Sequence, residues 1–272
     1  MPIMTEALDQ MTVTSYNLGQ VRDNLHHSLK STPLNAFSRK LAGLAALNDR
    51  DVALLDDASS PARMVPANHD LISEGDKPGP TFIVLEGWAC RYKVLPDGSR
   101  QIMAFLMPGD FCDLHIGLLD EMDHNIGTVS ACQIASLSGE RMERLICATP
   151  ALTQAFWRAQ LIDEGVMRAW IVSMGRRDSL QRVAHLMLEL HVRMRTVGLA
   201  EDESCRMPLT QTILADALGL TPVHLNRVLR TLRERGAMTF NLGMLTIQDI
   251  HALVRIAGFD DNYLHRRAKR AV

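Results

Sequence analysis

Residues 208–236 constrain the fold of this chain more than any other segment. Their sequence, PLTQTILADALGLTPVHLNRVLRTLRERG, contains a short helical pattern, a glycine and a longer helical pattern. Thr210 and Thr221 are typical N-cap residues for the two helices, and Pro222 suits the first helical position of the second. Gly219 supplies the left-handed conformation that a tight corner between helices requires. The segment therefore predicts two helices joined by a short turn.

The spacing of small and apolar residues specifies how these two helices meet. Ala215 is small where the helices would cross, and Gly219 follows it by four positions. Leu225 and Val228 lie six and nine positions after the glycine and would face the core. This is the spacing of a helix-turn-helix rather than of an ordinary corner between two helices.

Residues 237–247, AMTFNLGMLTI, add two short apolar runs on either side of Asn241-Leu242-Gly243. This pattern predicts a small hairpin, and a hairpin after the second helix makes a winged module. From Arg206 onward the chain has ten Lys and Arg against five Asp and Glu, a net charge of +5 within a chain whose net charge is −2. This basic C-terminal segment favours a polyanionic partner for the module.

The remaining composition limits the class of protein. With 272 residues the chain is long enough for two ordinary domains, and no apolar run is long enough to span a membrane. The N-terminal sequence does not resemble a signal peptide, so we expect a cytoplasmic protein without membrane contact. The cysteines are scattered without metal-ligand spacing, which favours reduced thiols in a cytosol: Cys90, Cys112, Cys132, Cys147 and Cys205.

Residues 35–148 are predicted to form a sensor domain rich in strands. Helical spacing over residues 35–57 is broken near Asn48, where a second cap could lie. Between residues 63 and 140, short apolar runs alternate with glycine and proline turns at roughly ten-residue spacing, which favours an antiparallel barrel or sandwich. The dipeptide Asp97-Gly98 between two such runs predicts a hairpin. Residues 1–34 have no periodicity and are predicted to be an N-terminal extension.

Residues 149–177 are predicted to form one long helix that begins at Thr149 and Pro150. Apolar residues recur close to every 3.5 positions along it, which is typical of a coiled-coil partner face. The same spacing also suits a helix that packs on its own barrel, and the sequence does not separate the two. We expect a dimer interface formed by Phe156, Ala159, Ile162, Val166 and Trp170. Residues 178–272, beginning with a second helix, are predicted to be the DNA-binding domain.

Taken together, these segments resemble the Crp/Fnr family of transcription regulators over about residues 35–250. The resemblance includes the turn glycines Gly75, Gly87 and Gly109 as well as the helix-turn-helix. It implies an α+β fold: an N-terminal antiparallel β-roll or jelly roll, a long dimerisation helix and a C-terminal winged helix-turn-helix. It also implies a homodimer that binds double-stranded DNA at an inverted repeat and contacts RNA polymerase.

The resemblance places the base-contacting residues at the start of the second helix of the motif, where an N-terminus entering the major groove meets base edges. Arg227 could pair bidentately with guanine. Pro222 and Val223 stand where cyclic-AMP-binding members carry charged residues, so the operator sequence is not transferred. The predicted DNA-binding residues are Thr210, Gln211, Thr221, Pro222, Val223, His224, Asn226, Arg227 and Arg230, of which the helix N-terminal Thr210, Gln211 and Thr221 suit phosphates.

The effector is not identified by the sequence. Cyclic-AMP-binding members carry an Arg-Ser pair for the phosphate, but no Arg or Lys occurs between Arg100 and Arg141, so tight binding of cyclic AMP is not expected. An iron-sulfur cluster is not expected, because no cysteine precedes Cys90. Two minor alternatives stay open: ligation of haem, and a thiol switch at Cys112 or Cys132. No cofactor or metal is predicted. The candidate effector pocket comprises Cys112, Asp113, His115, His124 and Asn125.

Two other classes of function compete with the regulator. A cupin-like barrel enzyme would need clustered histidines and a carboxylate on adjacent strands, whereas His69, His115 and His124 are widely spaced. No Walker loop, GxSxG or HExxH is present, so we do not expect an enzyme. A ligand-binding module that regulates a protein partner without touching DNA is the second alternative, and the helix-turn-helix argues against it.

Overall fold

The computed structural model describes residues 34–114 and 118–265. The predicted extension, residue His115 of the effector pocket and most of the basic C-terminal tail lie outside the described residues. The described chain begins with α3 (Ala36–Ala42) and α4 (Asp49–Ala58). The predicted break near Asn48 is confirmed, because Asn48 and Asp51 form a reciprocal capping box at the start of α4.

Seven strands form two antiparallel sheets, as the spacing of turns predicted. One sheet has the order β1 (Ala62–Val65), β7 (Cys132–Leu137), β3 (Thr81–Glu86). The other has the order β2 (Asp70–Ile72), β6 (Asn125–Thr128), β4 (Ala89–Val94), β5 (Arg100–Leu106). Apolar side chains from the strands and their loops fill a core, with Val84, Leu106, Cys112, Met122 and Ile126 among its buried members.

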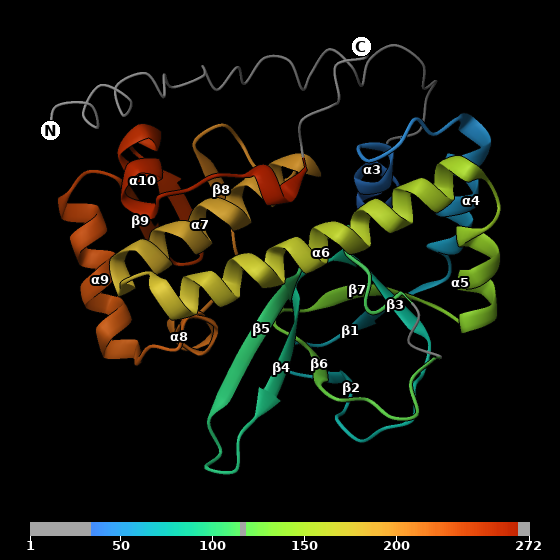
Figure 1. Cartoon of the computed structure of the whole chain (residues 1–272), viewed down its shortest axis with the longest axis horizontal. Coiled ribbons are helices and arrows are strands. Elements are labelled where there is room, and N and C mark those ends of the chain that lie inside the picture. Colours follow the sequence, from blue (N-terminus) through green and yellow to red (C-terminus); the bar gives the residue numbers. More distant parts are fainter. Residues whose placement is uncertain (1–33, 115–117, 266–272) are drawn as a thin grey trace, which may run out of the picture. The chain divides into compact units, whose positions relative to one another are not determined.

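The hairpin between β4 and β5 projects from the four-stranded sheet (Figure 1). Asp97-Gly98 lies in its turn, as predicted: Gly98 has a φ of 82° and the Asp97 carboxylate accepts hydrogen bonds from Ser99. The turn therefore fixes the start of β5 at Arg100 relative to the sheet.

After α5 (Gly139–Ile146), the long helix α6 extends over Pro150–Arg176, with Thr149 as its N-cap and Pro150 in its first turn. At about 1.5 Å per residue its 27 residues span roughly 40 Å. Figure 1 shows α6 running from the α4–α5 end of the β-roll to the end where α7 begins, and α7 (Ser179–Thr196) folds back beside it. The structure confirms a single long helix at this position.

The residues predicted for the dimer face of α6 pack against the chain's own core. Phe156 and Ala159 are 0% and 1% exposed and belong to the core that includes Phe37 and Phe111. Val166 is 4% exposed. Ile162 and Trp170 are partly buried and pack on the same core as Val166. The alternative, in which the seam packs on its own barrel, is the one observed.

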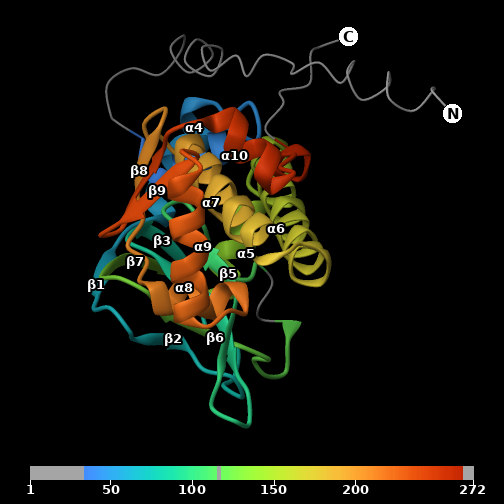
Figure 2. The same ribbon diagram turned by 90° about the vertical axis from the view of Figure 1, so that its left-hand side faces the viewer.

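The C-terminal unit is a winged helix-turn-helix, as predicted. It contains α7, α8 (Gln211–Leu218), α9 (Pro222–Glu234) and a sheet of order β8 (Ser204–Arg206), β10 (Met244–Ile247), β9 (Met238–Asn241). Figure 2 shows α8 and α9 on the side of this unit that faces the viewer. The helix α10 (Ile250–Ala257) and the 3-10 turn η2 (Asn262–Leu264) follow the wing and pack on α7 and α6, respectively. Across the described ranges, no helix combines the length and the apolar character that crossing a membrane requires.

Candidate nucleic-acid interface

The caps and the corner of the helix-turn-helix have the geometry that their residue types favour. Thr210 accepts a hydrogen bond from the Ile213 amide, and Thr221 accepts one from the His224 amide, each at 3.2 Å. Gly219 ends α8 in the left-handed conformation, with φ 61° and ψ 40°. Because these bonds fix the first turn of α9, the direction of its N-terminal side chains is set locally.

All nine predicted DNA-binding residues are exposed, as a nucleic-acid contact requires. Beneath them Leu225, Val228 and Leu232 are buried and attach α9 to the core. The exposed set consists of Thr210, Gln211, Thr221, Pro222, Val223, His224, Asn226, Arg227 and Arg230. Even the apolar side chain of Val223 is 63% exposed.

Besides the two capping threonines, three of these side chains are already held by hydrogen bonds within the unit. His224 Nε2 lies 2.9 Å from Ser179 Oγ at the start of α7. Asn226 donates from Nδ2 to Gln211 Oε1 at 2.7 Å, which joins the N-termini of α8 and α9. Ser179 thus helps to orient His224, a role that the sequence did not predict. Its position at the N-terminus of α7 was the only sequence feature that pointed to it.

The guanidinium groups of α9 are available to a partner. Arg227 and Arg230 are exposed and form no ion pair within the part of the chain that the structure describes. A positively charged, unpaired helix face beside a fixed helix N-terminus has the charge and donors that DNA phosphates and guanine edges accept.

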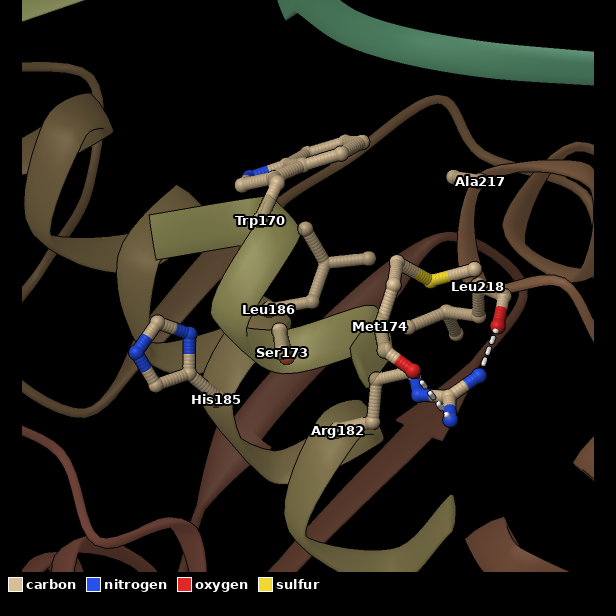
Figure 3. A pocket seen from close by; sticks show the side chains of 8 residues that line it. All are labelled: Trp170, Ser173, Met174, Arg182, His185, Leu186, Ala217 and Leu218. Atoms are coloured by element: carbon tan, nitrogen blue, oxygen red, sulfur yellow. Dashed lines mark hydrogen bonds between the residues drawn. The ribbon is translucent and has the colours of Figure 1, made fainter. Parts of the chain in front are cut away.

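Arg182 in α7 ties the helix-turn-helix to the end of α6. Its Nη1 donates to the Leu218 carbonyl at 2.7 Å, and its Nη2 donates to the Met174 and Arg177 carbonyls at 3.4 and 3.3 Å. Figure 3 shows the guanidinium next to Leu218 of α8 and Met174 in the last turns of α6. Since these carbonyls lie at helix C-termini, a cation is favoured there.

The predicted effector residues are only partly brought together. Cys112 is fully buried in the core of the β-roll, so burial raises the pKa of its thiol above the usual range. Asn125 accepts from the Glu74 amide and donates to the Tyr92 carbonyl, which are structural contacts. Asp113 and His124 do meet, with Oδ2 and Nε2 3.4 Å apart.

Sequence reasoning missed the arginine that joins this pair. Arg91 Nε lies 3.3 Å from Asp113 Oδ1, and Arg91 Nη1 lies 3.8 Å from Asp163 Oδ2 on α6. Burial disfavours the Asp113 carboxylate, but His124 and Arg91 outweigh it and lower the pKa of Asp113. The interaction with Asp113 and the bond to Asp123 raise the pKa of His124 despite its burial. No spacing signal links Arg91 to Asp113. The pairing of β4 with β6 sets Arg91 opposite Ile126, two residues after His124, and Asp113 comes from the segment between β5 and β6.

A second buried charge cluster joins the β-roll to α7. Asp110 Oδ2 lies 2.8 Å from Arg193 Nη2, and Asp110 Oδ1 lies 2.6 Å from Lys40 Nζ. Glu189, 0% exposed, accepts from Trp170 Nε1 at 3.0 Å and from Tyr263 Oη at 2.9 Å. Burial raises the pKa of Glu189, and Arg193 opposes that rise. These contacts are paired internally and hold elements together rather than presenting a site.

Known proteins match both halves of the chain. Residues 62–148 match the family model of the cyclic nucleotide-binding domain, and residues 181–256 match that of the Crp-like helix-turn-helix domain. The nitrogen fixation regulation protein FixK of Bradyrhizobium diazoefficiens is 31% identical over 180 residues, which cover 66% of this chain and 74% of that protein. The chain belongs to the Crp/Fnr family of transcription regulators. The DNA-binding regulator predicted from the sequence is thereby confirmed over the enzyme alternative.

Other members of the Crp/Fnr family support the same assignment. The transcriptional activator protein FnrL of Cereibacter sphaeroides is 24% identical over 206 residues, 74% of this chain and 82% of that protein. The solved structure of FixK2 from Bradyrhizobium japonicum has a TM-score of 0.62 at 22% identity and covers 72% of this chain and 96% of that one. A structure of CooA from Carboxydothermus hydrogenoformans has a TM-score of 0.59 at 15% identity, covering 72% and 87% of the two chains. These two likenesses support the α+β fold.

Proposed function

We propose that this Crp/Fnr regulator works as a homodimer that inserts the N-terminus of α9 into the major groove at each half of an inverted-repeat operator. The observation that carries the proposal is the exposed, capped start of α9 beside Arg227 and Arg230, which form no ion pair with any residue that the structure describes. Two such helices related by a twofold axis contact half-sites one duplex turn, about 34 Å, apart.

We place the dimer face on the side of α6 that points away from the core, in place of the buried side predicted from the sequence. Leu161, Ile171 and Val172 are 50%, 72% and 52% exposed. At about 100° per residue they lie within one sector of the helix, opposite Ala159 and Val166. Large apolar side chains exposed along one helix face favour contact with the same face of a second subunit. A twofold axis between the two subunits would bury both faces at once. Trp157, 50% exposed, lies within this stripe, and Met167, 44% exposed, lies at its edge.

The effector of this protein, where it has one, is proposed to differ from cyclic AMP. The core of the β-roll is filled by buried apolar residues such as Leu106, Met122 and Ile126. The arginine nearest the candidate pocket, Arg91, is already paired with two carboxylates. Among the described residues, the candidate pocket therefore has no unpaired cation for a buried cyclic phosphate. Isothermal calorimetry should detect no micromolar binding of cyclic AMP, and a micromolar dissociation constant would contradict this part of the proposal.

Selection from random duplexes by the full-length protein tests the DNA-binding mode. We expect recovery of an inverted repeat with half-sites one turn apart, and affinity that falls steeply as salt rises, because cations on the protein displace counterions from DNA. Recovery of single unrepeated half-sites, or of no sequence at all, would contradict the proposal. We further propose that the protein acts in the cytoplasm together with RNA polymerase, which a pull-down with bound operator can test.

A further inference from the structure

The helix-turn-helix and the sheet of the β-roll touch through a polar contact beside the turn of the β4–β5 hairpin. Arg100, the first residue of β5, places Nε and Nη2 each 2.8 Å from Asp216 Oδ2 in α8. Gln101 follows it and donates from Nε2 to the Ala217 carbonyl at 3.4 Å. These residues are 116 positions apart in the chain, so the contact joins the two functional units directly.

Asp216 places a negative charge near the C-terminal end of α8, which is unfavourable for a helix. It occupies the C-terminal half of a helix that ends at Leu218, where the helix dipole disfavours a negative charge. A carboxylate at that end is stabilised here by the Arg100 guanidinium, and both side chains are partly buried, at 35% exposed for Arg100 and 23% for Asp216. Arg100 is itself held in place, because it also lies 5.6 Å from the centre of the Tyr92 ring, and Tyr92 donates to Asp70 at 2.7 Å.

The surface around this ion pair is only partly filled. A cavity of about 130 Å³ lies between the outer face of the four-stranded sheet and α8, lined by Asp70, Tyr92 and Arg100 on one side and Ile213 on the other. Elsewhere the two units share one buried apolar core, to which Ile102 of the sheet and Leu214 of α8 belong, so the directional ion pair acts at the less tightly packed edge of this core. Meanwhile Thr210 and Gln211, at the opposite end of α8, are exposed. The contact therefore leaves the DNA-facing end open.

We propose that Arg100 and Asp216 are a positioning pair that fixes the helix-turn-helix on the sensor sheet and thereby sets where α9 lies for a two-half-site operator. The inference rests on the dimeric function proposed above. A rigid placement matters only when two recognition helices must fit one duplex together, because a single half-site accepts the unit in any orientation relative to the β-roll. The pair is thus expected to affect full operators and not isolated half-sites.

The test compares Arg100→Asp, Asp216→Arg and the double exchange in the full-length protein. The probes are the duplex that wild-type protein selects from a random library and the same duplex with one half-site scrambled. Each single variant should bind the full duplex about three- to tenfold more weakly while the scrambled duplex is bound equally well, and the double exchange should restore binding. The matched control is Arg141→Asp, which breaks the 2.9 Å Arg141–Asp57 pair between α5 and α4, at the end of the β-roll far from α8 (Figure 1).

Hydrogen exchange of α8 amides without DNA gives a second readout. Both single variants should exchange faster in α8, while the double exchange and the control should behave as wild type. Equal loss on both duplexes, failure of the double exchange to restore binding, or unchanged exchange in α8 would overturn the positioning role. Failure of wild-type protein to select any duplex would instead count against the proposed function, and the exchange experiment would still decide the docking contact.

Discussion

Replacing Ile171 by alanine should weaken the dimer of this protein without unfolding its subunits. Ile171 is 72% exposed on α6, so its side chain contributes little to the core of its own chain. Full burial of an isoleucine side chain stabilises a protein by about 1.5–3 kcal/mol. Because most of this side chain is exposed in the single subunit, roughly two thirds of that free energy would come from burial against a partner. Because a twofold axis duplicates each substitution, we expect the dimer to lose about 2–4 kcal/mol.

Sedimentation equilibrium can measure this loss as a change of the dimer dissociation constant. A loss of about 2–4 kcal/mol corresponds to a roughly 30- to 1000-fold rise in that constant. The matched control is Leu199→Ala, which truncates an exposed aliphatic side chain, 42% exposed, in the loop after α7. It should leave the constant unchanged. If Ile171→Ala dimerises as tightly as wild type, or if both variants weaken it alike, the assignment of this face of α6 is refuted.

Four further substitutions or conditions test the structure. Phe156→Ala should lower the free energy of unfolding by about 3–5 kcal/mol in chemical denaturation, because the ring is fully buried against the rings of Phe37 and Phe111. Thr221→Ala should cost about 1 kcal/mol in the same assay by removing the N-cap of α9, whereas Thr221→Ser should not. Arg227→Ala should weaken operator binding by about 1–3 kcal/mol in gel shifts and relax preference at one base pair; uniform weakening across all base pairs would assign Arg227 to a phosphate instead. Burial lowers the pKa of His185 to about 4, so the unfolded state binds an extra proton between about pH 6.5 and 4, and stability should fall by up to about 3 kcal/mol as pH drops through that window. His185→Gln should reduce that pH dependence, and an unchanged slope would mean that His185 is not its source.

Local chemistry explains the parts of the fold that could be predicted. A threonine before a helix, a proline in its first turn and a glycine at its end act within a few residues of themselves, so Thr210, Gly219 and Thr221 marked their elements correctly. The same holds for Asn48 at α4 and for the Asp97-Gly98 turn. The exposed start of α9 could be predicted for the same reason, because fixing the ends of a helix and its apolar positions also fixes the side that points outward.

The dimer face and the effector region show where this reasoning stops. Residues 150–176 carry two apolar stripes on opposite sides of one helix, and periodicity alone does not state which one meets the subunit's own core. The choice depends on Phe37 and Phe111, which reach Phe156 from distant parts of the chain. Short helices such as α5 and α10 lacked a long periodic pattern and were likewise not anticipated.

The sequence by itself therefore determined the helix-turn-helix, its caps and its outward-facing residues, since each depends on neighbours along the chain. Only the tertiary structure decided which side of α6 is exposed, that Arg91 neutralises Asp113, and that Arg100 meets Asp216. Such pairings depend on sheet order and on how separate elements pack, and the energy of an ion pair falls with distance in space, not along the chain.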